Sequence, residues 1–347
     1  MLEVNGEEKS GSGTILRLAI AFSSILGEEL HIYNIRKRRA KPGLRPQHLE
    51  AVLTAAKICG AKVEGAVLNS TELWYSPGKI RSGRITASIG TAGSIPMLLM
   101  TTMPICVHSD GQIILDISQG GTDVKNAPTI NYIDRILLPT LREMGIRTWL
   151  EVKRYGYYPK GNGEVSLTID PSHKLKPVKL ERFGEIIRVE GVSVATFLED
   201  RRVAERQAKS AEEYLEKNGI ECKITVVNDR SNRIQKGSSL LLRAQTDSGV
   251  ILGADSIGEI GKPSEEVGLE AARSLLREIE GRATVDTHLS DMVIPYLTFC
   301  DENSVFLCRE ITEHLDTNIW LAQRMLGARF EIEKKTNLYQ VKCLLRE

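Results

Sequence analysis

Hydrophobic positions along the chain switch repeatedly between the spacing of a strand and the spacing of a helix. Residues 2–5 predict a short strand, and the helix after it is marked by five apolar positions: Ile15, Leu16, Ala19, Phe22 and Leu26. Residues 30–35 alternate as a strand, and Pro46 suits the first turn of a following helix. This part of the chain therefore predicts the order strand, helix, strand, helix.

The same order returns twice further along. Strands are predicted at 85–89, 112–117, 148–153 and 164–169, with one buried helix from Ile95 and another starting at Ala127-Pro128. Near the carboxyl end, helices from His288 and from His314 alternate with strands at 305–309, 329–334 and 339–345. We interpret these segments as degenerate repeats of a unit that packs two helices on a sheet.

Between the second and third units lies a segment with a plan of its own. A polar connector at 171–177 precedes a strand at 185–195, an amphipathic helix at 201–218, two or three strands and a helix at 264–280. We interpret residues 184–282 as a small inserted α/β domain. The predicted fold class is α+β, with a large domain of repeated two-helix, four-strand units formed by residues 1–183 and 283–347.

Composition narrows the class of protein. The 347 residues are 41% hydrophobic, which is enough for two domains, and the 46 basic and 45 acidic residues nearly balance. A nucleic-acid site must therefore come from local clustering of charge. The six cysteines lack metal-ligand spacing, and no segment has the length of a membrane span or the pattern of a signal peptide. We expect a soluble, cytoplasmic protein with reduced thiols and no membrane association, and the oligomeric state stays open, a homodimer included.

His314 is the first candidate for chemistry, because it lies where a predicted strand meets a predicted helix. A neutral imidazole is a nucleophile near pH 7, and amides at a helix start suit an anionic partner. A lone histidine in such a place is more often only a polar residue near a helix cap. Other parts of the sequence must decide between these interpretations.

The densest positive cluster lies at residues 36–48, where Pro42-Gly43 and Pro46 interrupt a run of basic residues. Charge runs usually mark a solvated surface, but turn-forming residues favour a fixed corner. Arg39, Arg45 and Gln47 would then surround a place where a phosphate accepts charge-assisted hydrogen bonds. The glycine-rich turn at 6–14 matches neither common phosphate-loop pattern, and by itself it indicates ordinary turn chemistry.

Six segments in this order resemble the motifs of the RNA 3′-terminal phosphate cyclases. They are residues 35–48, 90–94, 120–123 with Ala127-Pro128, 154–159 with Gly161 and Gly163, 285–291, and His314-Leu315-x-Thr317-Asn318-Ile319. The resemblance runs nearly from end to end. It implies the fold of the cyclases and enolpyruvyl transferases, with repeated units and a small inserted domain, in agreement with the pattern above.

The resemblance also implies a reaction. ATP adenylylates a histidine with loss of pyrophosphate, AMP passes to the 3′-phosphate of an RNA, and the neighbouring 2′-hydroxyl attacks the activated phosphorus. A 2′,3′-cyclic phosphate forms and AMP leaves. The expected cofactors are ATP and a divalent cation, Mg²⁺ or Mn²⁺, and the expected partners are RNA 3′-phosphate ends.

Site residues follow by position. His314 falls on the adenylylated histidine of the family. The adenosine-binding positions correspond to His288, Leu289, Ser290, Asp291, Met292, Met100, Pro128 and Tyr132. The positions that bind nucleotide or RNA phosphates correspond to Arg17, Arg36, Arg39 and Gln47.

Two departures from the family concern the metal and the nucleotide. Ser10 replaces an acidic residue tied to the metal, which leaves the metal ligands unknown, with Glu7 and Glu8 close by. Met100 and Met292 stand where the family commonly has glutamines, and a thioether cannot make the two hydrogen bonds of an amide.

Two alternatives remain. Ribosome-assembly proteins share the cyclase fold without its activity, but they lack the basic signature and the histidine, which this chain keeps. Enolpyruvyl transferases have a similar repeat fold, and fold similarity is weak support for a function. Adenylylation by labelled ATP separates the first alternative from a cyclase, and turnover of phosphoenolpyruvate would favour the second.

Overall fold

The first repeat follows directly from the alternation at the amino end. In the computed structural model, which describes residues 1–345, its elements are β1 (Leu2–Asn5), α1 (Gly13–Leu26), β2 (Leu30–Tyr33), α2 (Pro46–Cys59), β3 (Lys62–Glu64) and β4 (Leu73–Ser76). The sheet has the order β1-β2-β4-β3. Strands β1 and β2 are parallel, and the other two pairs are antiparallel.

The second repeat has the same topology. It consists of β5 (Gly83–Ser88), α3 (Ile95–Val107), β6 (Ile113–Gly120), α4 (Ile130–Tyr132), the π-helical turn η1 (Ile133–Leu137), α5 (Leu138–Glu143), β7 (Thr148–Arg154) and β8 (Gly163–Ile169). The strand order is β5-β6-β8-β7, again with the first pair parallel.

The third repeat is split by the insertion. Its first strand, β9 (Lys179–Leu180), lies before the insertion and pairs in parallel with β14 (Ser304–Cys308) after it. The remaining elements are α8 (Thr287–Met292), α9 (Ile294–Leu297), α10 (Glu313–Leu326), β15 (Arg329–Lys334) and β16 (Tyr339–Leu344). The order β15-β16-β14-β9 repeats the topology of the first two sheets, which confirms the predicted α+β fold of repeated units.

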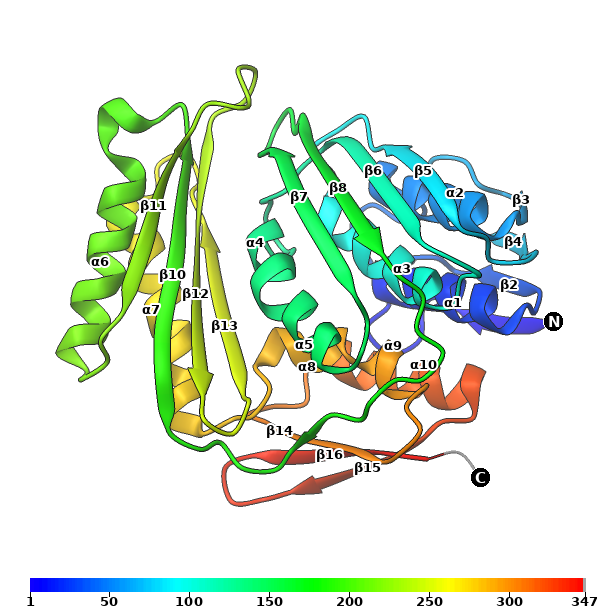
Figure 1. Cartoon of the computed structure of the whole chain (residues 1–347). Helices are drawn as coiled ribbons and strands as arrows, with labels where there is room; N and C mark the ends of the chain where they lie inside the picture. Colours follow the sequence, from blue (N-terminus) through cyan, green and yellow to red (C-terminus); the bar gives the residue numbers. More distant parts are fainter. Residues whose placement is uncertain (346–347) are drawn as a thin grey trace.

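The inserted segment forms a fourth sheet, which stands apart on the left of Figure 1 with two helices on its outer side. Its elements are β10 (Ile186–Thr196), the 3₁₀ turn η2 (Glu199–Arg201), α6 (Val203–Lys217), β11 (Lys223–Asp229), β12 (Gly237–Thr246), β13 (Ile251–Ile257) and α7 (Ser264–Gly281). The strand order is β11-β10-β12-β13. This segment has its own hydrophobic cluster, which includes Phe183 from just before the predicted boundary. The domain boundaries at 183/184 and 282/283 stay a prediction. Residues 346–347 of the predicted large domain lie outside the described residues.

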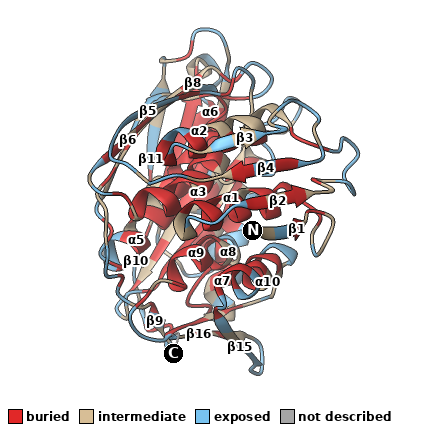
Figure 2. Cartoon of the chain, turned by 90° about the vertical axis from the view of Figure 1, so that its right-hand side faces the viewer, coloured by how far each residue is buried: buried red, intermediate tan, exposed pale blue. Residues whose placement is uncertain are grey.

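The helices of the three repeats gather in the interior, and their sheets lie at the periphery (Figure 1). Helices α1 and α3 are the most central and are almost wholly buried (Figure 2). Helix α1 packs against α2, α3 and α10. Apolar side chains such as Ile15, Ile20 and Phe22 are therefore completely buried, each contributing about 1.5–3 kcal/mol relative to exposure. This packing places the amino ends of α1 and α10 side by side.

Two details differ from the sequence-based expectation. The helix expected to start at Ala127-Pro128 begins at Ile130, because the Thr129 hydroxyl accepts a hydrogen bond from the Tyr132 amide and caps it there. Strands β3 and β9 have three and two residues, too few for alternation to reveal them, and the four-residue strand β4 was not predicted either.

Two further observations concern the environment of the protein. Among residues 1–345, none of the helices combines the length and the apolar composition needed to cross a bilayer. All six cysteines are free thiols, and five of them are buried.

Candidate active site

Helices α1 and α10 bring two distant segments together at their first turns. Ser12 caps α1 and Thr312 caps α10, each accepting a hydrogen bond from a backbone amide two or three residues ahead. Thr14 and His314 thereby face each other, with 3.2 Å between Thr14 Oγ1 and His314 Nδ1. Two helix starts in contact provide backbone N–H groups and positive dipole ends, which suit an anionic ligand.

Arg17 completes this contact from the next turn of α1. Its Nη2 donates to Thr14 Oγ1 at 3.0 Å, so the hydroxyl lies between the guanidinium and the imidazole. Burial lowers the pKa of Arg17 to about 10, an effect partly opposed by Asp291. Arg17 therefore stays charged at neutral pH.

The predicted nucleophile, His314, is exposed on the surface of this junction. Partial removal of water lowers its pKa below the ordinary value, and the positive charges of Arg17 and Arg39 lower it further. Glu313 acts in the opposite direction. The imidazole is therefore neutral near pH 7, which is the form that can act as a nucleophile.

A small cavity beside Thr14 joins several of the predicted residues. It has a volume of about 30 Å³, and its lining includes Arg17, Met100, Asp291, Met292 and Asn318. That volume holds about one or two water molecules. Burial raises the pKa of Asp291 to about 7, and the Asn318 side-chain amide donates to the Asp291 backbone carbonyl at 2.8 Å. The structure thus places Arg17, Met100, Asp291 and Met292 together.

The segment that precedes Asp291 is organised by Asp286. This carboxylate caps α8, accepting from the amides of His288 and Leu289 at 3.0 Å each. It also accepts from the Tyr132 hydroxyl at 2.6 Å and from the Gly253 amide at 2.9 Å. Burial raises its pKa, and the hydrogen bonds from Tyr132, Leu289 and Gly253 and the charge of His288 oppose the shift. The carboxylate therefore ties α8, α4 and the inserted strand β13 together.

The other predicted adenosine residues lie around this anchor. The exposed His288 ring meets Tyr132 edge to face, with 6.1 Å between centroids. Leu289 and Ser290 are buried, so their side chains face away from solvent. Pro128 is half-buried in the loop before Thr129, whose amide donates to Asp255 of β13 at 2.7 Å. The inserted sheet therefore contacts both segments.

The basic corner at residues 36–48 is fixed by its own hydrogen bonds. Arg36 donates through Nη1 to the carbonyls of Lys41 and Gly43, at 2.8 Å each. Gln47 accepts from the Ser94 amide at 2.9 Å and ties α2 to the glycine turn at 90–94. Arg39 is exposed, and its guanidinium makes no hydrogen bond or ion pair within the described part of the chain. Of these three predicted residues, Arg39 is the one with its charged group free for a ligand.

His48 belongs to the basic corner at residues 36–48, but the sequence did not mark it as a site residue. It is buried directly beneath Gly13, where any β-carbon would overlap its ring. Its Nδ1 accepts from the Arg45 amide at 3.3 Å. Burial lowers the pKa of His48 to about 3, and Arg17, Arg36 and Arg45 lower it too, so the ring is neutral. The neutral His48 ring therefore adds no positive charge to the region where Arg17, Arg36 and Arg45 lie close together.

Thr14 and Asp286 were not predicted either. Thr14 shares a helix face with Arg17, three residues on, and this spacing was the available signal. Asp286 precedes a helix at a capping position, which is the signal that could have identified it.

The acidic residues near Ser10 do not form a metal cage. The Ser10 hydroxyl lies 3.0 Å from that of Ser12, and Glu7 pairs with Lys37 at 3.3 Å. Within residues 1–345, no group of three or more His, Cys, Asp or Glu side chains could hold a metal ion.

The fold and the site together define an α+β protein with a neutral histidine at two helix starts beside arginines, an arrangement that suits an anionic ligand. The chain belongs to the RNA 3′-terminal phosphate cyclase family, because the family of that description matches residues 8–332. Three proteins called RNA 3′-terminal phosphate cyclase are similar over almost the whole length.

The one from Caldivirga maquilingensis is 42% identical and covers 95% of this chain and 94% of its own. The one from Methanopyrus kandleri is 40% identical and covers 96% of both chains. The one from Pyrococcus furiosus is 40% identical and covers 96% of this chain and 95% of its own. Among solved structures, the enolpyruvyl transferase NikO from Streptomyces tendae is 10% identical with a TM-score of 0.28, covering all of this chain and 66% of NikO. At that TM-score the likeness supports no argument.

Proposed function

We propose that the protein converts an RNA 3′-terminal phosphate to a 2′,3′-cyclic phosphate, using ATP and a covalent adenylate on His314. The family membership supports the overall reaction, and the contact between Thr14 and His314 supports the choice of nucleophile. The steps below derive from the residues around that contact.

In the first step, a ring nitrogen of His314 attacks the α-phosphorus of ATP, and the bond to the pyrophosphate oxygen breaks. Thr14 Oγ1 accepts from Arg17, and it has both a second lone pair that can accept from Nδ1–H and a proton that can be donated to a bare Nδ1. The proposal takes the first arrangement, with the proton on Nδ1, because the attack needs a lone pair on the nitrogen that Thr14 does not contact. The lone pair is then on Nε2, the nitrogen that points away from Thr14 and performs the attack.

In the second step, an oxygen of the RNA 3′-phosphate attacks the AMP phosphorus, and the N–P bond breaks. Imidazole is a good leaving group, so the AMP passes on readily. In the third step the RNA 2′-hydroxyl attacks the activated 3′-phosphorus, its proton is lost, and AMP departs. Negative charge grows on non-bridging oxygens in each step, and the guanidinium groups of Arg17 and Arg39 lie where they can stabilise it.

The adenosine lies over the mouth of the small cavity, because about 30 Å³ cannot contain it. His288 and Pro128 form the adenine-facing group in this proposal, and Met100 and Met292 supply apolar contact. The Tyr132 ring is completely buried, so it supports His288 edge to face and does not contact the base itself. A bound Mg²⁺ or Mn²⁺ would neutralise phosphate charge at this site. We further propose a cytoplasmic protein, since six free thiols favour a reducing compartment.

The observation that supports this function most directly is the neutral His314 at two helix starts, with Thr14 on one of its nitrogens. The test is intact-protein and peptide mass spectrometry after incubation with ATP and Mg²⁺. We expect one AMP adduct, acid-labile and located on His314, and none in His314→Asn. The matched control is His173→Asn, which replaces another exposed histidine and should keep the adduct.

A second measurement uses an RNA with a labelled 3′-phosphate. Conversion to a phosphatase-resistant end is expected with the parent protein and is lost with His314→Asn. A protein that binds RNA but forms no adduct and no resistant end would instead match the non-catalytic ribosome-assembly relatives.

A further inference from the structure

A large cavity lies between the inserted segment and the second repeat. Its volume is about 940 Å³, within the usual range for ligand sites. The loop at 123–125 and the Tyr157-Tyr158 pair line it on one side, and the starts of α6 and α7 with the loop at 257–263 line it on the other. Its lining shares no residue with the small cavity beside Thr14.

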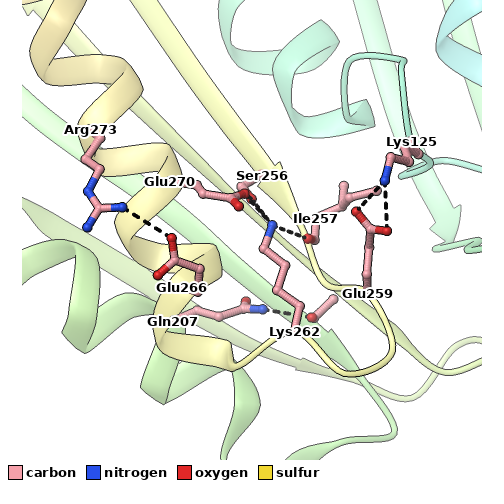
Figure 3. A network of polar contacts seen from close by, with 10 residues as sticks. Lys125, Gln207, Ser256, Ile257, Glu259, Lys262, Glu266, Glu270 and Arg273 are labelled. Carbon is pink, nitrogen blue, oxygen red and sulfur yellow. Dashed lines mark hydrogen bonds and ion pairs between the residues drawn. The ribbon is translucent and has the colours of Figure 1, made fainter.

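Positive charge dominates the lining, but most of it is already paired. Lys125 pairs with Glu259 across the mouth at 3.2 Å, Lys262 pairs with Glu270, and Arg206 pairs with Glu265 at 2.7 Å. Figure 3 shows the first two of these pairs, with Lys262 also directed toward Ser256 and the Ile257 carbonyl. These three cations therefore have little charge left for a ligand.

Arg201 and Lys236 are the exceptions. Both are exposed lining residues, and neither side chain forms a hydrogen bond or ion pair with another described residue. The nearby Glu199 pairs with Arg230 at 2.6 Å, and the positive charge of Lys236 also lowers the pKa of Glu199. Of the two carboxyl groups in the lining, Glu259 pairs with Lys125, and burial raises the pKa of Asp123 to about 7, so the negative charge of Asp123 is incomplete at neutral pH. The cavity therefore has two exposed cations, Arg201 and Lys236, without a direct ion-pair partner among the described residues.

The walls add apolar surface and two helix starts. Leu198, Val203 and the buried Tyr157 form part of the wall, and Tyr158 stands at its edge with 77% of its surface exposed. Helices α6 and α7 have 15 and 18 residues and begin here, and neither has a side-chain cap. In α1 and α10, by contrast, a side chain caps the first turn. The combination suits a ligand with both an aromatic base and a phosphate.

We propose that this cavity binds a nucleotide of the RNA strand upstream of the 3′ end, with its phosphates on Arg201 and Lys236 and a base against Tyr158. The inference rests on the proposed function, which makes RNA the substrate. The loop from 123 to 132 connects the two regions: Asp123 accepts from the Ile130 amide at 3.3 Å, and Tyr132 bonds to Asp286 beside His288. The loop therefore extends from the lining of the large cavity to the residues beside His288, and the proposal takes the RNA to follow it.

The test compares Arg201→Ala/Lys236→Ala with the control Lys209→Ala/Arg277→Ala. The control removes two exposed cations from α6 and α7 that do not line the cavity. Fluorescence anisotropy measures the Kd of a single-stranded RNA of twelve nucleotides with a 3′-phosphate, over a range of salt concentrations. Loss of two phosphate contacts should lower the slope of log K against log salt by about 1.4, since each contact contributes about 0.7. We expect the Kd to rise about tenfold in the cavity variant and less than about twofold in the control.

Two further measurements make the result specific. Tyr158→Ala should raise the Kd of the same RNA roughly fivefold or more without changing the slope of log K against log salt, because stacking does not release counterions. A dinucleotide with a 3′-phosphate should bind the cavity variant and the parent equally, since it reaches only the active site.

An unchanged slope and Kd with the longer RNA would overturn the assignment. An equal rise in the Kd of the dinucleotide in the cavity variant would also overturn it. Binding of AMP or inorganic phosphate in the cavity that does not compete with the longer RNA would overturn it as well. Formation of the AMP adduct is measured separately, without RNA, and should be unchanged in the cavity variant. If the parent forms no adduct while the salt slope still changes, the proposed function fails and the cavity assignment stands.

Discussion

Replacing Thr14 with valine tests whether the threonine hydroxyl orients the nucleophile. Valine keeps the shape of threonine and loses only the hydroxyl, which lies between Arg17 Nη2 at 3.0 Å and His314 Nδ1 at 3.2 Å. The change leaves one guanidinium donor and one ring nitrogen without a partner. Because Thr14 is only 8% exposed, water does not readily replace the missing oxygen.

The magnitude follows from the strength of such contacts. A typical hydrogen bond contributes about 0.5–1.5 kcal/mol, and an unsatisfied buried donor costs about 1–3 kcal/mol. If the bond to His314 is needed to present Nε2, its loss raises the barrier to adenylylation by about 1.4 kcal/mol. That corresponds to roughly a tenfold slower formation of the AMP adduct. Binding of ATP should change little, because Thr14 acts on the histidine.

The assay is rapid-quench measurement of adduct formation, combined with urea unfolding and ¹⁵N NMR of the His314 ring. Thr140→Val is the matched control, since Thr140 is also 8% exposed and donates to a helix carbonyl at 2.9 Å. It should lose similar stability and keep the parent rate, and Thr14→Ser should recover most of the rate. NMR should show the proton on Nδ1 in the parent and a mixture in Thr14→Val. A folded Thr14→Val protein with the parent rate and tautomer would refute the reasoning.

Three other expectations concern the basic corner. Arg39→Ala should weaken binding of 3′-phosphorylated RNA roughly tenfold while changing stability by less than about 0.5 kcal/mol, because the residue is exposed. The control is Lys41→Ala. A large fall in melting temperature that accompanies the loss of binding would contradict this expectation. Gly13→Ala should destabilise the protein by about 1–3 kcal/mol in urea unfolding, because the added methyl overlaps His48, and His48→Ala should relieve part of that loss in the double variant. The pKa of His48 is lowered to about 3 in the folded protein, so the unfolded chain binds an extra proton as pH falls below about 6.5. The stability that neutral His48 contributes is therefore fully present above that pH, and about 1.4 kcal/mol of it is lost per pH unit below. Between pH 7 and 5, the free energy of unfolding of His48→Gln should fall by about 2 kcal/mol less than that of the parent. Parallel falls in the two proteins would contradict this.

Much of the fold could be predicted because its elements are long enough to show their period. Helices α1 and α10 and the strands of the second repeat follow the apolar spacing closely. Strand β9 could not be predicted in this way, because it has two residues and its partner β14 lies beyond the insertion. Its place in the sheet depends on a pairing that local sequence does not contain.

The site divides in the same manner. Residues such as His314 and Asp291 belong to recognisable motifs, and the structure does bring their segments together. The contact of Thr14 with His314 joins residues 300 positions apart, so it appears only once α1 packs against α10. The neutral state of His48 likewise depends on burial beneath Gly13, which spacing along α2 does not reveal.

The insertion also contributes to the active site through two hydrogen bonds. Gly253 donates to Asp286, and Asp255 accepts from the Thr129 amide, so β13 holds both segments predicted to face the adenosine. Glycine is required at 253 because a side chain there would meet Ile136 and Tyr132, which allows β13 to approach η1 closely. If the inserted sheet moved away, Asp286 would lose one of four donors inside the protein, and an unsatisfied buried carboxylate is costly. The sheet that carries Arg201 and Lys236 on its helices and loops is therefore held in place relative to His288 by these two hydrogen bonds.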